Sequence, residues 1–326
     1  MSLRLSDYDY DLPAELIAQR PLPRREDARM MVLRRDAQTV EDRRFVELKT
    51  LFSPGDLLVL NDTRVVPARK FSDDGGIEFL FVERLGRARW KCLIKPGRKF
   101  RVGATTRIDH VIARVEEILP EGERIVTLDE DADLYAGGSM PLPPYIGRES
   151  DPQDEARYQT IFADAPGAIA APTAGLHFTR EILDDIPHAF VTLHIGTGTF
   201  RPVRSENISE HRMHAERFSI SPSAAARINS TGRIVAVGTT VVRVLESAMR
   251  EDGKLIGQEG STNIFIYPPY RFRGVDVLLT NFHLPRSTLL MLVSAFAGRE
   301  FLLRAYQEAI REGYRFYSYG DCMLIL

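Results

Sequence analysis

The sequence is poor in cysteine: of its 326 residues only Cys92 and Cys322 are cysteines, and no CxxC or Cys/His spacing surrounds them. Neither a disulfide framework nor a zinc site is therefore predicted. Long hydrophobic runs are also lacking, since the strongest one, residues 288–297, has about half the length that a membrane span needs. The N-terminal residues show no apolar stretch typical of a signal peptide. We therefore expect a cytoplasmic protein without a membrane segment.

A net charge of one sign is lacking as well, because 43 basic and 45 acidic residues leave a formal charge of −2. The distribution of charge is less even: residues 83–107 hold nine basic residues and one acidic residue, whereas residues 116–133 hold eight acidic residues and one arginine. Such segregation can direct a polyanion such as RNA to one face of a protein. Solvated faces of ordinary β-strands would give the same pattern, so both interpretations stay open.

The chain is long enough for two domains or for one domain with an insertion. The first part holds a short helical pattern at 13–19, a basic loop at 20–29 and a continuous apolar run at 55–61, which is typical of a strand covered on both faces. Residues 69–146 are different, with short β-branched and aromatic segments between Gly/Pro turn signals. This texture predicts a small antiparallel β-barrel-like domain.

After residue 150 the pattern alternates between strands and helices. Apolar strands are predicted at 189–195, 232–238 and 274–280, and helices at 240–249, 287–296 and 299–310. This alternation favours an α/β fold with a partly parallel sheet or an incomplete α/β barrel. We therefore expect residues 1–68 and 147–326 to form one discontinuous α/β core, with residues 69–146 as an inserted all-β domain.

Small and titratable polar residues follow four predicted strands. In parallel α/β folds, ligands bind at the carboxyl ends of the strands. Thr239, Thr240 and Ser287 also fit ordinary helix N-caps, although a helix start can equally bind a carboxylate or phosphate. The residues concerned are Asn61, Asp62, Thr63 and Arg64; His194; Thr239, Thr240 and Arg243; and Asn281, His283, Ser287 and Thr288.

Three histidines are candidates for chemistry. His177 lies in the cramped segment APTAGLHFT, and His194 precedes the Gly- and Thr-rich segment IGTGTF. A buried ring without a partner is costly, so each is either a hydrogen-bonded core histidine or a functional group. His283, at another strand end, joins them. A separate pair, His211 and His214, is placed by its i, i+3 spacing on one helix face and suggests a possible metal site together with Glu216.

Seven segments together resemble one known family. They are LLVLNDTRVVPAR, APTAGLHFT, LHIGTGTFRPV, EHRMHAERF, VGTTVVRVLES, TNFHLPRSTLLMLVSAFAG and YRFYSYGDCMLIL. In this order they resemble the S-adenosylmethionine:tRNA ribosyltransferase-isomerases of queuosine biosynthesis, and the resemblance runs from YDYDLPAELIAQRPL to the last residue. The sequence departs from the family pattern at Ala28, where serine is usual, and at Cys322, where alanine is common.

The resemblance implies a reaction that transfers the ribosyl part of S-adenosylmethionine to the 7-aminomethyl-7-deazaguanine base of a tRNA. Adenine and methionine leave, and the transferred ribose is rearranged to give epoxyqueuosine-tRNA. The family needs no metal and no redox cofactor, since S-adenosylmethionine is consumed as a substrate. The family fold, an α/β domain carrying an inserted β domain, agrees with the organisation above. No protein partner is implied.

Roles follow for particular residues as hypotheses. His177, His194 and His283 are the acid/base candidates for removal of the ribose C5′ proton and protonation of the leaving adenine. Thr239, Thr240 and Arg243 suit the methionine carboxylate, and Asp62 or Glu246 suits the ribose hydroxyls or the methionine ammonium. Gly175, Gly196 and Gly198 allow close approach to a substrate. Further substrate-binding candidates are Asn61, Arg64, Thr173 and Asn281.

For tRNA, the expected phosphate contacts come from the basic loop at 20–35 and from the basic strands at 84–107. The candidates are Arg24, Arg25, Arg84, Arg87, Arg89, Lys95, Arg98, Lys99 and Arg101. Two alternatives compete with the transferase. One is a metal-assisted hydrolase that uses His211, His214 and Glu216, and the other is a non-catalytic tRNA-binding module built on the basic β insert.

Overall fold

The structure is a computed structural model that describes residues 3–196, 198, 203 and 205–326. Its centre is a mixed nine-stranded sheet with the order β15-β13-β12-β3-β14-β16-β17-β1-β2. The strands are β1 (Arg29–Arg34), β2 (Thr39–Arg44), β3 (Asp56–Asn61), β12 (His188–Leu193), β13 (Glu216–Ile220), β14 (Arg233–Val237), β15 (Gln258–Thr262), β16 (Val277–Asn281) and β17 (Cys322–Ile325). The sheet is thus partly parallel, as one of the two predicted alternatives states, and its edge strands β15 and β2 stand at opposite ends of the order.

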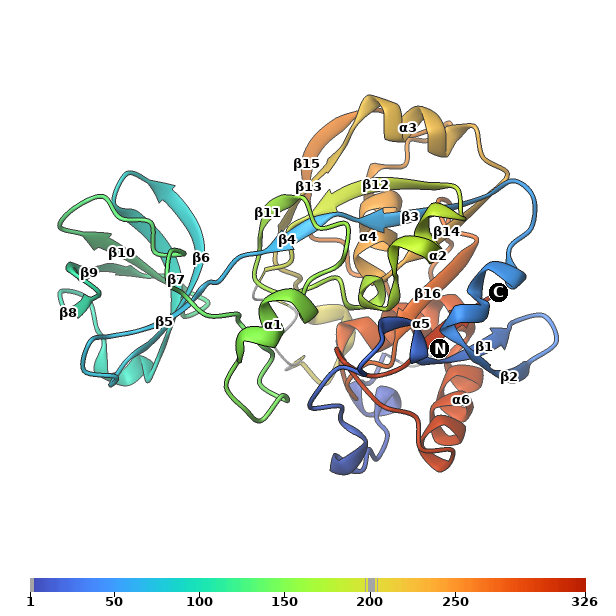
Figure 1. Cartoon of the computed structure of the whole chain (residues 1–326), viewed down its shortest axis with the longest axis horizontal. Helices are drawn as coiled ribbons and strands as arrows, with labels where there is room; N and C mark the ends of the chain where they lie inside the picture. Colours follow the sequence, from blue (N-terminus) through green and yellow to red (C-terminus); the bar gives the residue numbers. More distant parts are fainter. Residues whose placement is uncertain (1–2, 197, 199–202, 204) are drawn as a thin grey trace.

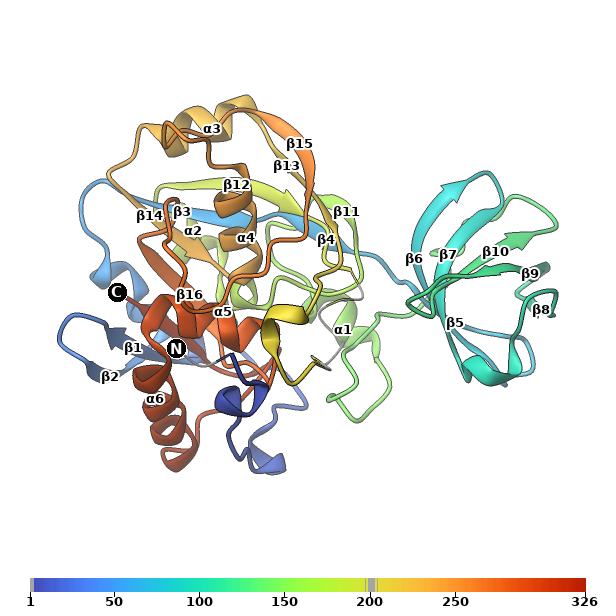
Figure 2. The same cartoon turned by 180° about the vertical axis from the view of Figure 1, so that it is seen from behind.

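Both faces of this sheet are covered. Along β3, Leu57 and Val59 belong to one apolar cluster, while Leu58 and Leu60 belong to another on the opposite face, because successive strand residues point to opposite sides. The predicted doubly covered strand at 55–61 is confirmed. The first face packs against α3 (Pro222–Asn229), α4 (Thr239–Ala248), α5 (Thr288–Ala297) and α6 (Arg299–Arg311), and the second against α2 (Arg180–Asp184) and η4 (Phe45–Leu51). Figures 1 and 2 show these helices around the sheet from opposite sides.

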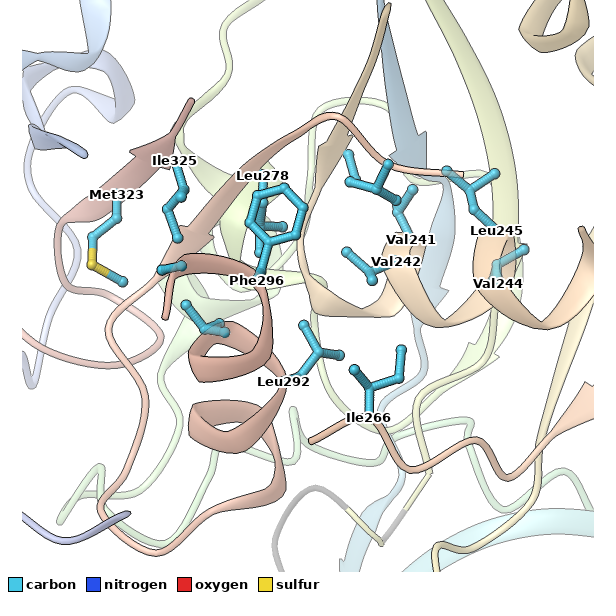
Figure 3. Close-up of a cluster of buried hydrophobic side chains, with 14 of the residues drawn as sticks. Val241, Val242, Val244, Leu245, Ile266, Leu278, Leu292, Phe296, Met323 and Ile325 are labelled. Carbon is cyan, nitrogen blue, oxygen red and sulfur yellow. The ribbon is translucent and has the colours of Figure 1, made fainter. Parts of the chain in front are cut away.

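Helices α4 and α5 fill the centre of the first face. Figure 3 shows Val241 and Leu245 of α4 and Leu292 and Phe296 of α5 in one buried apolar cluster with the sheet residue Leu278. Almost every residue of α4 is buried, so this helix is embedded and its first turn is held rigidly against the sheet. The predicted helices at 240–249, 287–296 and 299–310 are confirmed with shifts of one residue at their ends.

The strands β12, β3, β14 and β16 lie side by side and run parallel. Their carboxyl ends therefore meet at one edge of the sheet. This edge receives the residues that follow each strand, among them His194, Asn61, Gly238 and His283. The predicted convergence of the strand ends is confirmed.

The chain between β3 and α1 (Pro152–Arg157) builds a second sheet, whose six strands pair antiparallel throughout in the order β5-β6-β7-β10-β9-β8. It stands to one side of the larger sheet (Figure 1). Its strands are β5 (Arg69–Phe71), β6 (Glu78–Gly86), β7 (Arg89–Lys95), β8 (Thr105–Ile108), β9 (Val111–Ile118) and β10 (Arg124–Leu128). Trp90, Phe79 and Phe81 lie in its separate core. The exact limits of the insert, 69 and 146, stay a prediction.

The helix expected at 13–19 is wrong, because only the 3₁₀ turn Ala14–Leu16 forms there. Tertiary pairing takes over the backbone: Phe316 N–H donates to Leu16 O, and Ala18 N–H donates to Phe316 O. The remaining elements are the short strand pair β4 (Thr63–Val65) and β11 (Ala165–Ala168) and the 3₁₀ turns η1 (Leu5–Tyr8), η3 (Arg25–Asp27), η5 (Gly97–Lys99), η6 (Thr173–His177) and η8 (Ile208–Glu210). Within the described ranges, no helix combines the length and the apolar composition of a membrane span.

Candidate functional site

A cavity of about 890 Å³, counting its open mouth, lies at the carboxyl ends of β14 and β16. We call it the first cavity. Its walls come from η6 and the residues before it, from the start of α4, from the segment after β16, and from two segments far away in the sequence. The lining residues are Pro143, Tyr145, Tyr158, Ala170–Ala174, Ile195, Gly238–Thr240, Arg243, Thr280–Leu284, Ser287–Leu289, Tyr317 and Ser318.

The first turn of α4 forms one wall of the first cavity. Gly238 is the N-cap of this helix with φ +90°, a conformation that favours glycine, and its N–H donates to Leu279 O at 2.7 Å. The expectation that Thr239 or Thr240 caps the helix is therefore wrong, because both already lie in its first turn. The N–H groups of a first turn lack intrahelical acceptors, and the helix dipole favours negative charge there. The wall suits a carboxylate.

Arg243 lies one turn further along α4, with 2% of its surface exposed. Its Nη1 forms an ion pair with Glu216, but its guanidinium makes no hydrogen bond of good geometry with any described residue. Because a buried guanidinium carries five N–H donors, most of its donor capacity is left for a ligand. The predicted association of Thr239, Thr240 and Arg243 in one site is found in the first cavity.

The sequence did not predict Glu216, the first residue of β13, as a partner of Arg243. Its Oε1 accepts a hydrogen bond from Gly196 N–H at 3.0 Å, and only 6% of the residue is exposed. The sequence placed Glu216 only in a possible metal cluster. The spacing of 27 residues between Glu216 and Arg243 gives no local signal of their contact, since the pair forms between an antiparallel strand and a crossover helix.

A second cavity shares Arg243, Thr288 and Leu289 with the first. It lies between the large sheet and the β9–β10 turn of the insert, and His214 Nδ1 pairs there with Glu121 Oε2 at 2.5 Å. The other lining residues are Pro120, Gly198, Ser205, Glu210–Met213 and Glu216. Gly198 packs against His214, since a Cβ on this glycine would lie 3.3 Å from the ring.

His283 lies in the first cavity, and its Nε2 is 2.7 Å from Thr280 Oγ1. Its backbone N–H donates to the Tyr306 hydroxyl at 2.9 Å, which fixes the turn after β16. Burial lowers the pKa of His283 from 6.5 to about 3, because a charged ring is poorly solvated there. The ring is therefore neutral near pH 7.

His177 is buried behind the wall of the first cavity rather than in it. Its ring packs 5.3 Å from the ring of Phe45, and it lines a small separate cavity together with Arg25 and Tyr319. Burial lowers the pKa of His177 to about 4, with the side chain of Asn281 opposing the shift. Its Nε2 makes no hydrogen bond of good geometry with a described residue. His177 thus reaches the first cavity only through Asn281.

His194 is half-buried, and its Nδ1 lies 2.9 Å from Thr63 Oγ1. A Cβ on Gly167 would come within 2.9 Å of this ring, so the histidine packs closely against β11. Burial, and then the charge of Arg217, lower its pKa. His194 does not line either of the two cavities described above. The three histidines therefore share one edge of the sheet but not one cavity.

The two asparagines at strand ends differ in what they do. Asn281 lines the first cavity, where its Nδ2 donates to Tyr317 O at 2.9 Å. Its side chain also faces His177 and opposes the lowering of the pKa of that ring. Asn61 is used internally, because its Oδ1 accepts from Thr63 and Leu193 N–H. It joins the ends of β3 and β12.

Four further substrate candidates do not reach the first cavity. Glu246 accepts hydrogen bonds from the N–H groups of Arg273 and Gly274 at 3.1 and 2.9 Å, which fixes that loop. Asp62 accepts from Thr192 Oγ1 at 2.6 Å on the other side of β12, and burial raises its pKa. Arg64 donates to Ala163 O. Gly175 lies against Phe162 and Thr160, which a Cβ would meet at 2.9 Å, so it serves internal packing. Thr173 does line the cavity, and Gly196 holds Glu216.

The possible metal site was predicted on the assumption that His211 and His214 lie on one helix face. This assumption is wrong, because residues 211–215 form no helix. Among the residues that the structure describes, no three histidine, cysteine, aspartate or glutamate side chains lie close enough together to hold a metal ion. Aromatic residues of the first cavity were not predicted. These residues are Tyr145, Tyr158 and Tyr317. Of the three, Tyr317 alone lies in one of the family motifs named above.

The basic residues predicted to bind tRNA fall into two groups. Several are engaged: Arg25 donates to the carbonyls of Leu176, Ala156 and Gln159, and burial lowers its pKa to about 10. Arg24 pairs with Glu26, Arg84 and Arg87 with Asp131, and Arg89 with Glu116. Lys95, Arg98 and Arg101 are exposed and make no ion pair within the described part of the chain. The side chain of Lys99 lies outside the described part.

Comparison with known proteins places these features in a family. Residues 5–325 match the model of a family described as "Queuosine biosynthesis protein". A curated S-adenosylmethionine:tRNA ribosyltransferase-isomerase of Moorella thermoacetica is 49% identical over 99% of this chain and 100% of its own length, and one of Desulfitobacterium hafniense is 48% identical over the same shares. The crystal structure of S-adenosylmethionine tRNA ribosyltransferase from Thermotoga maritima is similar with a TM-score of 0.57 and 39% identity, covering 98% of this chain and 100% of that one.

Proposed function

The chain belongs to the queuosine biosynthesis protein family, and we infer that it is an S-adenosylmethionine:tRNA ribosyltransferase-isomerase. In this reaction the ribosyl part of S-adenosylmethionine is transferred to the 7-aminomethyl-7-deazaguanine base of tRNA and isomerised, and adenine and methionine leave. The first cavity is the observation that supports this function and the position of the active site. A helix start, a buried arginine and a buried histidine meet there at the strand ends.

S-adenosylmethionine binds in the first cavity, and its methionine carboxylate lies at the start of α4. Two features support this position: the first-turn N–H groups of Thr239 and Thr240 and the unused donors of Arg243. Together they match a carboxylate, because hydrogen bonds to an ionised acceptor are stronger than neutral ones. Tyr145, Tyr158 and Tyr317 supply apolar walls for the adenine ring.

His283 is the first candidate for acid/base chemistry, since it lines the cavity that holds the substrate. A base must be unprotonated before it can take the C5′ proton, and burial keeps this ring neutral. Thr280 orients the ring through the contact with Nε2. His177 acts behind the cavity wall through Asn281, and His194 stays an untested candidate at the same sheet edge.

The tRNA approaches from the side of the insert, where the exposed cations Lys95, Arg98 and Arg101 make no ion pair with a described residue and can contact phosphates. The cytoplasmic location and the absence of a required metal or redox cofactor stay predictions.

The test uses purified protein, S-adenosylmethionine and tRNA that carries the aminomethyl-deazaguanine base, with no metal added, and it measures free adenine by chromatography. Adenine release that depends on the modified tRNA supports the proposal. Activity that appears only after a divalent metal is added would favour the hydrolase alternative, and tRNA binding without loss of S-adenosylmethionine would favour the binding module.

A further inference from the structure

Glu216 lies in the wall that separates the two cavities. It lines the second cavity, while its partner Arg243 lines both. The residue is 6% exposed, and its Oε1 is held by Gly196 N–H. Its Oε2 pairs with Arg243 but accepts no hydrogen bond of good geometry from any described residue. A carboxylate oxygen can accept two hydrogen bonds, so this buried oxygen, which belongs to a residue that lines the second cavity, has unused acceptor capacity beside its ion pair.

The second cavity adjoins the first cavity and also reaches the insert. The β9–β10 turn contributes Pro120 and Glu121 to its outer part, and Thr288 and Leu289 belong to both cavities. Glu216 lines the second cavity, whereas it does not line the first cavity.

Carboxylates from three segments face the second cavity, namely those of Glu121, Glu210 and Glu216. The other charged or titratable groups are Arg243 of α4 and His211, Arg212 and His214, which precede β13; His214 is paired with Glu121. Two of the carboxylates thus have a partner on their own chain. Of these three carboxylates, Glu216 alone combines burial with an oxygen that accepts no hydrogen bond of good geometry from a described residue, and the complement of a carboxylate is a cationic donor such as an ammonium group.

We propose that Glu216 receives the aminomethyl group of the tRNA base in the second cavity and takes a proton from it. This proposal rests on the proposed function, which supplies the amine. In the step, one N–H bond of the ammonium breaks, an O–H bond forms at Glu216 Oε2, and the electron pair stays on nitrogen. The neutral amine can then form a bond to the ribosyl carbon. Without this step an ammonium group has no lone pair with which to attack.

Arg243 connects this step to the first substrate. A methionine carboxylate at the start of α4 and the carboxylate of Glu216 are both acceptors for the same guanidinium, which lines both cavities. When the substrate carboxylate occupies donors of Arg243, Glu216 Oε2 is available to the amine. The arrangement favours deprotonation of the amine when S-adenosylmethionine is already bound.

The test compares the full-length protein with its Glu216→Gln variant, and the matched control is Glu259→Gln on the neighbouring strand β15, where the side chain is exposed. Transfer of the ribosyl group to modified tRNA is measured from pH 6 to pH 10, and binding of S-adenosylmethionine is measured by calorimetry. We expect Glu216→Gln to lose at least about 100-fold in rate at pH 7 while it keeps S-adenosylmethionine affinity within about threefold. Its rate should rise about tenfold per pH unit toward the amine pKa, because only the neutral amine fraction then reacts. The control should follow the unaltered protein.

A pH profile of Glu216→Gln that runs parallel to that of the unaltered protein would overturn the proposal, as would a rate loss explained entirely by weaker S-adenosylmethionine binding. Circular dichroism reports whether this variant folds. If it does not, Glu216→Asp, which retains the carboxylate, should show a reduced rate with the original pH profile, and a steep profile there also overturns the proposal.

Binding of tRNA with and without the aminomethyl group separates this result from the proposed function: the unaltered protein should prefer the aminomethyl form even if it proved to transfer nothing, and equal binding would refute the role of Glu216.

Discussion

Arg243 and Glu216 form an ion pair that is almost completely buried, in the wall shared by two adjacent cavities. Removing one member of such a pair leaves an uncompensated buried charge, which costs about 3–5 kcal/mol. This buried pair lies at a position where the guanidinium makes no hydrogen bond of good geometry with a described residue, so most of its donors are unused. This combination is typical of a binding site rather than of a stabilising core contact.

Arg243→Lys should raise the KM for S-adenosylmethionine at least about tenfold, since lysine keeps the charge but loses the planar set of donors. Steady-state adenine release measures this effect. The control is Arg250→Lys, at an exposed position just beyond α4, which should leave KM unchanged. An unaltered KM in Arg243→Lys would remove Arg243 from the substrate site.

His283→Asn should lower kcat about 100-fold or more, because the ring lines the first cavity and is oriented by Thr280. The readout is single-turnover adenine release. His110→Asn, in an exposed turn of the insert, is the control and should behave as the unaltered protein. If His283→Asn keeps full activity while His177→Asn or His194→Asn loses it, the chemistry belongs to those histidines instead.

Stability should fall as the pH drops from 6.5 toward 4. His177 and His283 have pKa values of about 4 and about 3 in the folded protein, whereas an unfolded histidine titrates near 6.5. In this window the unfolded chain binds the extra protons, so each histidine removes about 2 kcal/mol between pH 7 and pH 5. Urea denaturation at these two pH values checks the sum.

The same experiment on His177→Phe should show a smaller difference between pH 7 and pH 5, because one of the two groups is gone. Asp62 and Asp321, whose pKa values burial raises, act in the opposite direction at lower pH. A difference that is unchanged in the variant would contradict the assignment of the pH effect to this histidine.

Neutralising the exposed cations Lys95, Arg98 and Arg101 together should weaken tRNA binding and reduce the salt dependence of log K by about one unit per lost phosphate contact. Filter binding over a range of salt concentrations measures the slope. The matched triple variant at Arg84, Arg87 and Arg89 should change the slope less, since those guanidinium groups are paired with Asp131 and Glu116. Equal slopes in all three proteins would place the tRNA elsewhere.

The sequence by itself determined most of the helices and strands of the core and the insert, and their order along the chain. The continuous apolar run of β3, the helical periodicity of α4 to α6 and the turn-rich strands of the insert depend on local side-chain patterns, and these patterns predicted a partly parallel sheet with polar residues at its ends. Family motifs then identified the chemistry. Where a pattern was short, as at 13–19, backbone pairing with Phe316 replaced the predicted helix.

Only the tertiary structure decided which polar residues share a cavity. Asn61 and Glu246 looked as suitable as Asn281 and Arg243, but their oxygens are used by the backbone of neighbouring segments. Glu216 contacts Arg243 because β13, which begins at Glu216, lies beside α4 in the fold although the two are distant in the sequence. Partner choice depends on distances between segments, and residue spacing along one chain does not encode these distances. For this reason the edge of the sheet and several members of its cavity, among them Thr239, Arg243 and His283, were predicted, whereas the absence of Asn61, His177 and His194 from the cavity was not.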